Sequence, residues 1–171
     1  SSAYSLSQTG ELGNDKTFFL PGADLWLLAV LNSPLMWWHN WRYLVHLKDE
    51  ALSPQGVKME SLPVAPPSAE ARAEAQDAAA RLVELTRDRQ ERAHDLADWF
   101  RVEHGLEKVP LVLRSPFDLD EEGWVAAIRS ARGRSRPLSV AALRATRDEY
   151  HASVAPVRAL QPEALHLERR L

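Results

Sequence analysis

One short segment, Leu27–Leu44, combines aromatic side chains with basic ones, and these residue types could contact a charged partner. It holds three of the chain's six tryptophans: Trp37, Trp38 and Trp41. Three basic residues accompany them: His39, Arg42 and His46. At about 100° per helical residue, the tryptophans share a wide face and the basic residues form a neighbouring stripe. Because Arg and His are seldom fully buried without partners, this stripe is a candidate polar contact surface. The aromatic face has two interpretations, the core of a small domain or a docking surface.

A second basic group lies in the sequence RSARGRSR, which contains no acidic residue. Its members are Arg129, Arg132, Arg134 and Arg136. Two interpretations stay open for them. They can be the cationic end of a solvated helix, with Gly133 as its cap. Alternatively, they can contact phosphate groups, with an affinity that depends on salt and not on base sequence.

Catalytic and metal-binding patterns are absent from the sequence. It has no Gly-rich phosphate loop, no GxSxG, no HExxH and no paired-carboxylate motif. His39 and His46 are too far apart along a helix for direct chelation by adjacent turns, and no third ligand supports them. The acidic run Asp118–Gly123 fits a helix start better than a calcium loop. We therefore predict no metal site and no enzyme activity in this chain alone.

Composition limits the classes of partner and compartment. The 171 residues are 45% hydrophobic and 26% charged, which is typical of a folded protein with a core. The net charge of −3 gives no global basic field, so any nucleic-acid binding must use local patches. The absence of cysteine excludes disulfides and makes a reducing cytoplasm the simplest compartment. The longest apolar run, LWLLAVL, is too short to span a bilayer, so we predict no membrane partner.

The first 66 residues have a mixed pattern of short elements. The run KTFFLPG is β-like and ends at Pro21 and Gly22. Asp24 can cap a helix whose apolar positions include Leu25 and Leu31. Ser33 and Pro34 then form an N-cap and first-turn pair that restarts the helix. The run VKMESLPV predicts an edge strand, and the proline-rich run LPVAPPS then prevents a helix until Ser68.

The remainder is rich in Ala, Leu, Glu and Arg and predicts long helices. One extends from Ser68 to about His104, roughly 55 Å, and needs a partner helix. Residues 139–171 supply it, with Pro156 and Pro162 as interruptions. A connector at about 105–138 contains a predicted strand, VPLVL, and a helix that begins near Asp120. The predicted fold is α+β and mainly α, with a small mixed subdomain (1–66) followed by a long antiparallel helical pair (67–171).

An ordered series of motifs resembles a known family. The series TFFLPGADLWLLAVLNSPLMWW, then a basic loop, then ESLPVAPPS before a long helix, resembles the C-terminal target-recognition region of Taq-type adenine-specific DNA methyltransferases. These include single-chain restriction–modification enzymes. Their Leu-Asn-Ser corresponds to Leu31–Ser33, and their proline-containing strand corresponds to Leu62–Pro67. The passage into the long helix also resembles the specificity subunits of type I restriction systems. The resemblance is close over residues 16–68 and loose over the helical remainder.

The resemblance implies a division of labour between this chain and a second domain. Residues 1–66 would be part of a DNA target-recognition domain, and residues 67–171 a spacer or docking region. The family's cofactor-binding glycine motif and its catalytic Asn-Pro-Pro-(Tyr/Phe) motif are absent from this chain. The chain also starts abruptly, without an initiating Met. S-adenosylmethionine and the catalytic residues are therefore expected in an upstream catalytic domain, and this chain itself is expected to need no cofactor.

Two function hypotheses follow. In the first, the chain positions the methyltransferase on double-stranded DNA, with base contacts near Lys48–Lys58 and phosphate contacts from Arg42 and the arginine group. The candidate DNA-binding residues are Arg42, His39, His46, Lys48, Lys58, Arg129, Arg132, Arg134 and Arg136. In the second, the long helices form a protein-interaction or homodimerisation module without direct DNA contact. The tryptophans Trp37, Trp38 and Trp41 are the candidate docking residues, against the enzyme's own catalytic domain or another protein.

Overall fold

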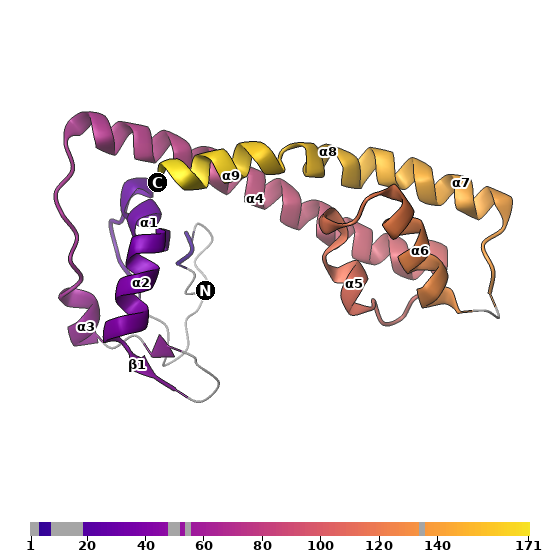
Figure 1. Cartoon of the computed structure of the whole chain (residues 1–171), viewed down its shortest axis with the longest axis horizontal. Coiled ribbons are helices and arrows are strands. Elements are labelled where there is room, and N and C mark those ends of the chain that lie inside the picture. The colour runs from indigo at the N-terminus through magenta and orange to yellow at the C-terminus, as the bar shows by residue number, and fades with distance from the viewer. Residues whose placement is uncertain (1–3, 8–18, 48–51, 54–55, 134–135) are drawn as a thin grey trace. The chain divides into compact units, whose positions relative to one another are not determined.

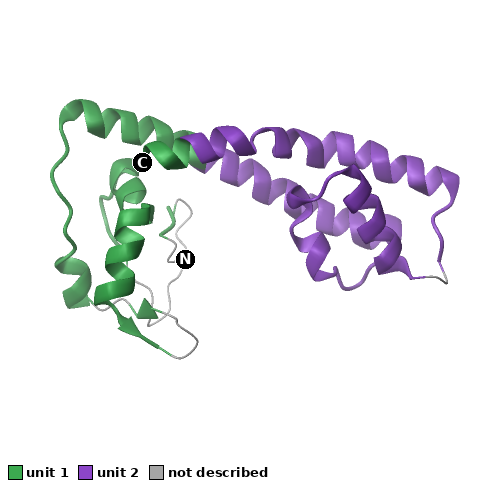
Figure 2. Ribbon diagram, viewed as in Figure 1, with its two compact units in different colours: residues 1–82, 167–171 green, residues 83–166 purple. Residues whose placement is uncertain are grey.

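The computed structural model describes residues 4–7, 19–47, 52–53, 56–133 and 136–171, and these are mostly helical (Figure 1). A two-stranded antiparallel sheet accompanies the helices. The predicted class, α+β and mainly α, is confirmed. The chain divides into two compact units, residues 1–82 with 167–171, and residues 83–166 (Figure 2). The long helix α4 (Ala69–His104) contributes residues to both.

In the first unit, two short helices follow each other closely, as predicted. Helix α1 (Leu25–Asn32) begins after Asp24, whose Oδ1 accepts a hydrogen bond from the Leu27 N–H at 2.9 Å. Helix α2 (Pro34–Tyr43) begins after Ser33, whose Oγ accepts one from the Met36 N–H at 3.2 Å. Both caps satisfy a backbone donor that has no partner inside its own helix. The Asn-Ser-Pro sequence therefore ends one helix and starts the next.

The predicted strands in this unit are wrong where the structure describes them. The sheet is formed by β1 (Val45–His46) and β2 (Leu52–Ser53), with Val45 opposite Ser53. The run VKMESLPV instead forms helix α3 (Gly56–Glu60) and a turn. Its alternation of Val57 and Met59 does not reflect burial, because Val57 is 78% exposed. In KTFFLPG, residues 16–18 lie outside the described residues, Phe19 and Leu20 are not in a strand, and Pro21–Gly22 form a turn.

The proline-rich run leads into the long helix as predicted. Residues 62–68 contain no helix or strand, and α4 begins at Ala69. The Ser68 Oγ accepts a hydrogen bond from the Ala71 N–H at 3.1 Å and so caps the helix. The helix continues to His104, which confirms the predicted span.

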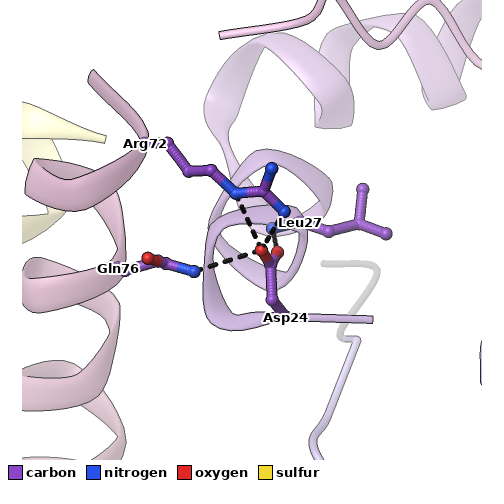
Figure 3. A network of polar contacts seen from close by, with 4 residues as sticks. All are labelled: Asp24, Leu27, Arg72 and Gln76. Carbon is purple, nitrogen blue, oxygen red and sulfur yellow. Dashed lines mark hydrogen bonds and ion pairs between the residues drawn. The ribbon is translucent and has the colours of Figure 1, made fainter. Parts of the chain in front are cut away.

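A polar network centred on Asp24 connects α1 to the first turns of α4 (Figure 3). Besides capping α1, Asp24 forms an ion pair with Arg72 and accepts a hydrogen bond from Gln76 Nε2 at 3.1 Å. The Arg72 guanidinium lies 5.3 Å from the centre of the Trp26 ring. Hydrogen bonding from Arg72, followed by that from the Leu27 N–H, lowers the pKa of Asp24. One carboxylate therefore orients α1 against α4.

The second unit begins at the C-terminal end of α4 and continues through a short connector. The predicted strand VPLVL is wrong, because it forms the single turn α5 (Leu111–Arg114), followed by the 3-10 turn η2 (Pro116–Asp118). Pro110 fixes the start of α5, where the Leu113 N–H donates to the Pro110 carbonyl at 3.0 Å. Leu113 is buried, whereas Leu111 is 80% exposed, so this apolar run does not indicate a buried strand.

Helix α6 (Glu121–Arg132) begins where the sequence predicts. The Oδ1 of Asp120 accepts a hydrogen bond from the Gly123 N–H at 2.8 Å, and Glu121 and Glu122 favour the positive end of the helix dipole. The helix ends at Gly133, whose φ of 72° is readily available to glycine. Both predicted ends of this helix are confirmed.

A segmented helix then returns antiparallel to α4, and all of it except residues 167–170 belongs to the second unit (Figure 1). Its parts are α7 (Val140–Glu149), the π-helical segment η3 (Tyr150–Val154), α8 (Ala155–Ala159) and α9 (Gln161–Arg170). Pro156 has no N–H for the Ala152 carbonyl, and its ring would crowd that carbonyl in a regular helix. The π-helical turn precedes Pro156, and Arg92 Nη1 on α4 lies 3.5 Å from the Ala152 oxygen as a substitute donor. The prediction that Pro156 interrupts the helix is confirmed.

The core of the second unit is aromatic. Trp124 of α6 is fully buried, with its ring centre 5.1 Å from that of Phe100 and 6.0 Å from that of Trp99. Its Nε1–H donates a 2.9 Å hydrogen bond to the carbonyl oxygen of Thr146 on α7. One side chain, Trp124, therefore connects α6 to both α4 and α7.

Candidate functional site

Helix α2 presents aromatic side chains to solvent. Its buried residues are Met36 and Asn40, whereas Trp38 is 55% and Trp41 39% exposed. The core interpretation is therefore wrong for these two tryptophans. Trp37 is half-buried, with its ring centre 5.7 Å from that of Trp41. We call the exposed group the α2 surface; its members are Leu35, Trp38, Trp41, Arg42 and Tyr43.

The three basic residues predicted on one helix are divided, because α2 ends at Tyr43, before His46. The Arg42 guanidinium lies 5.8 Å from the centre of the Trp38 ring, in cation–π range. His46 lies in β1, beyond the end of α2, yet its Nε2 is 2.6 Å from the Trp41 carbonyl oxygen. The rings of His39 and Tyr43 lie 4.7 Å apart. Residues 34–47 contain no carboxylate, so the α2 surface combines aromatic rings with the positive charge of Arg42.

The predicted base-reading segment is described only in part. Lys48 lies outside the described residues, as does Arg134 in the second basic group. Lys58 is exposed, on helix α3 and not in a loop. The structure does not bring Lys58 into any described contact with the α2 surface.

Three arginines gather where α4 and α6 both end. We call them the basic cluster: Arg129, Arg132 and Arg136. Arg132 is half-buried, and its Nη1 lies 3.2 Å from His104 Nδ1 and 3.5 Å from the His104 carbonyl oxygen. Its Nε donates to the Arg136 carbonyl oxygen at 3.1 Å. Arg132 therefore joins the end of α4 to the loop after α6, and its guanidinium is engaged within the protein.

The other two arginines of the cluster face solvent. In the described part of the chain, the guanidinium groups of Arg129 and Arg136 form no hydrogen bond or ion pair. Both line a depression of about 530 Å³. Its described walls are Arg129, Ser130, Gly133, Arg136, Pro137 and Leu138, which include no acidic side chain.

His104 is a buried residue that the sequence interpretation missed. It is 2% exposed, and burial, followed by the charge of Arg132, lowers the pKa of its imidazole, while Glu103 opposes this shift. Because Arg132 donates toward Nδ1, the proton of the neutral ring is assigned to Nε2. Nε2 has no described hydrogen-bond partner, and the ring meets Trp99 edge-on at 4.6 Å. In the sequence, the one signal for this residue was its position directly before Gly105, a glycine that ends a helix.

Replacing Gly105 by alanine is expected to lower the free energy of unfolding by about 1–2 kcal/mol. Gly105 has a φ of +62° and ends α4, where the Leu106 N–H donates to the Phe100 carbonyl at 3.2 Å. The added Cβ would lie 3.5 Å from Arg136 Nη1, an ordinary contact, so the cost arises from the backbone conformation. Urea denaturation followed by circular dichroism measures it. Gly105→Asn should lose less stability than Gly105→Ala, because asparagine tolerates this backbone conformation better. Equal losses of stability in the two variants would contradict the explanation.

Comparison with known proteins gives one family. A family model described as a domain of unknown function, DUF8810, matches residues 68–171. The chain belongs to this family. The DUF8810 domain contains the whole basic cluster, His104 and the depression, whereas the α2 surface precedes it in the chain. No curated protein and no solved structure matches the chain.

Among the described residues, no group of three or more His, Cys, Asp or Glu side chains lies close enough to hold a metal ion. No helix in the described ranges, including those of the DUF8810 domain, is long and apolar enough to cross a membrane.

Proposed function

We propose that the chain is the DNA target-recognition region of a restriction–modification enzyme with adenine-specific methyltransferase activity. The resemblance over residues 16–68 supports this. Its Leu-Asn-Ser element lies at the junction of α1 and α2. Its proline-containing element leads directly into α4, but it does not form the strand that the resemblance implies. Sequence features that mark the family thus coincide with the boundaries of these helices.

The observation that carries the proposal is the composition of the α2 surface. A segment that carries the cation Arg42 beside the exposed Trp38 ring, and no carboxylate, attracts a polyanion locally. The chain as a whole has a net charge of −3, so this attraction is local. Such a patch suits a recognition region that acts together with a second DNA-contacting domain.

In this proposal the chain does not carry out the methyl transfer. A separate catalytic domain binds S-adenosylmethionine and modifies the adenine, and the chain brings that domain to its site. Trp37, Trp38 and Trp41 supply the candidate contact with that domain, and α4 with its returning partner helices acts as the spacer. The compartment proposed for such an enzyme is the cytoplasm.

The test is the salt dependence of DNA binding by the 171-residue chain. Fluorescence anisotropy of a labelled duplex is measured over a series of NaCl concentrations. We expect Arg42→Gln to weaken binding and to reduce the slope of log K against log [NaCl] by about 0.9, the value for one phosphate contact. Arg101→Gln is the matched control, because it removes the same charge from an arginine paired with Asp98 on α4. Binding that is absent or independent of salt would contradict the proposal, as would equal losses in the two variants.

A second candidate function is a protein-interaction module without DNA contact. The specific observation in its favour is the exposure of Trp38, Trp41 and Tyr43, since Trp, Tyr and Arg dominate interface hot spots. The solution mass of the chain, measured by sedimentation equilibrium, separates the candidates. A stable homodimer that has no affinity for the duplex would favour this second function.

A further inference from the structure

We propose that Arg129 and Arg136 form a binding site for one phosphate group in the DUF8810 domain, and that Arg132 is its positioning residue. This site is separate in sequence from the α2 surface. The inference rests on the proposed function only in naming the DNA backbone as one source of the phosphate. Free phosphate is the other source, and both present the same tetrahedral oxyanion.

The guanidinium groups of Arg129 and Arg136 are open to an external ligand. Arg129 and Arg136 are exposed, and within the described residues neither has an internal partner. Single surface arginines of this kind are ordinary, but these two line the same concave depression. A guanidinium presents several N–H donors in a planar fork, which matches phosphate oxygens in bidentate geometry. Two such forks around one depression can surround a single oxyanion.

The walls of the depression suit a ligand of this charge. Ser130 supplies a hydroxyl, Gly133 leaves backbone accessible, and Pro137 and Leu138 provide apolar sides. No carboxylate is among its described walls. The volume of about 530 Å³ lies within the roughly 300–1,000 Å³ typical of small-ligand sites, so the phosphate can carry an organic group.

Helix dipoles explain part of the cluster and leave part unexplained. The C-terminal ends of α4 and α6 carry partial negative charge, and nearby cations stabilise both. Arg132 already serves this purpose, since its guanidinium contacts the carbonyl oxygen of His104 at the end of α4. Two further cations with no described internal partner then remain beside an acid-free depression. An external anion accounts for them.

Arg132 fixes the geometry of the site without being free to bind the ligand. Its Nε holds the backbone of Arg136, while its Nη1 is anchored at His104. The Arg136 N–H also donates to the Gly133 carbonyl at 3.3 Å, which connects Arg136 to the residue that ends α6. The backbone position of Arg136 relative to α6 is therefore set by Arg132. Lysine keeps the charge at this position but cannot make both contacts.

The experiment is a titration of the ¹⁵N-labelled 171-residue chain with sodium phosphate at constant ionic strength, followed by amide and arginine Nε shifts. We expect saturable shifts at Ser130, Gly133 and Arg136. Arg129→Gln and Arg136→Gln should each weaken phosphate binding by roughly tenfold or more, as for a lost charge-assisted contact. The double variant Arg101→Gln/Arg144→Gln removes two positive charges elsewhere in the second unit, one more than either single variant, and should bind as before. Absent or unsaturable shifts would overturn the site, as would equal losses in the control.

Arg132→Lys separates positioning from charge. We expect phosphate affinity to fall severalfold while the amide spectrum outside residues 104–138 is unchanged. Affinity retained in Arg132→Lys would overturn the positioning role. If this variant does not fold, shifts of the Arg132 Nε resonance in the native chain decide instead, because a positioning residue shifts less on saturation than Arg129 and Arg136.

A duplex DNA arm identifies the source of the phosphate. If the site holds a backbone phosphate, Arg129→Gln/Arg136→Gln reduces the salt slope of duplex binding by about 0.9. Saturable phosphate shifts with an unchanged slope support the site and assign it to free phosphate. The salt slope can also fall in Arg129→Gln/Arg136→Gln and stay unchanged in Arg42→Gln. This result would contradict the role proposed for the α2 surface and leave this site in place. The two proposals can therefore fail separately.

Discussion

Replacing Trp124 by alanine is expected to lower the free energy of unfolding of the second unit by about 3–5 kcal/mol, the range for loss of a large buried aromatic ring. Trp124 has no exposed surface and packs against Phe100, Trp99 and Tyr150. Its removal leaves a cavity between α4, α6 and α7 that rigid helices fill only in part. Urea denaturation followed by circular dichroism gives the free energy, and amide hydrogen exchange assigns the loss to residues 83–166.

Two variants separate the ring from its polar group and from tryptophan content in general. Trp124→Phe keeps an aromatic ring and loses the hydrogen bond to the Thr146 carbonyl, which also accepts the Tyr150 N–H. The free energy of unfolding should fall less in Trp124→Phe than in Trp124→Ala. Trp38→Ala makes the same chemical change at a position 55% exposed, and we expect a change within about 0.5 kcal/mol. A loss in Trp38→Ala as large as in Trp124→Ala would contradict the assignment of the core.

The second prediction is a loss of stability in mild acid that depends on His104. Burial and Arg132 lower the pKa of His104 in the folded chain, below its value of about 6.5 in the unfolded chain. The unfolded state therefore binds a proton more readily than the folded state. The stabilising contribution is complete above about pH 6.5 and decreases as the pH falls toward the folded pKa. A protonated imidazole would also lose the Nδ1 acceptor that Arg132 contacts.

The measurement is the urea midpoint of the chain between about pH 7.5 and pH 5. His104→Phe keeps a buried ring without a titrating group, so its midpoint should vary less over this interval than that of the native chain. His94→Gln is the control on the same helix, with a side chain 80% exposed, and it should leave the native pH dependence intact. A native midpoint that does not change, or one that changes equally in His104→Phe, would refute the role of His104.

The sequence predicted the helices well because their determinants are local. Asp24, Ser33 and Asp120 are capping residues placed directly before apolar periodicity, and each accepts the expected backbone hydrogen bond. The long run without Gly or Pro after Ser68 left no alternative to one continuous helix. Pro156 interrupts the returning helix for reasons of covalent structure.

The strands were predicted poorly because a short apolar run does not distinguish a strand from a helical turn. A strand needs a second strand to pair with, and which segments pair depends on the tertiary structure. Leu111 and Val57 occupy apolar positions of two of the mistaken strands, and both are largely exposed. The apolar composition of these runs therefore indicated that Leu111 and Val57 would be buried, and they are not.

The sequence grouped the candidate arginines but did not distinguish the contacts that each one makes. In the sequence, Arg129, Arg132 and Arg136 are equivalent members of one run. The structure distinguishes them, because the end of α4 returns His104 to within hydrogen-bond distance of Arg132 alone. That contact joins residues 28 apart in the chain, and no local pattern announces it. The same holds for α2, whose buried side is set by what packs against Met36 and Asn40.

The π-helical segment Tyr150–Val154 has a consequence for family alignments. The Ala155 N–H donates to the Tyr150 carbonyl, so this turn holds one residue more than an α-helical turn. Removing one residue here would restore regular winding while α7 and α8 kept the faces they present to α4. We therefore expect DUF8810 sequences one residue shorter at this point to share the same core. A single-position gap in this turn would record an ancient insertion event and not a change of architecture.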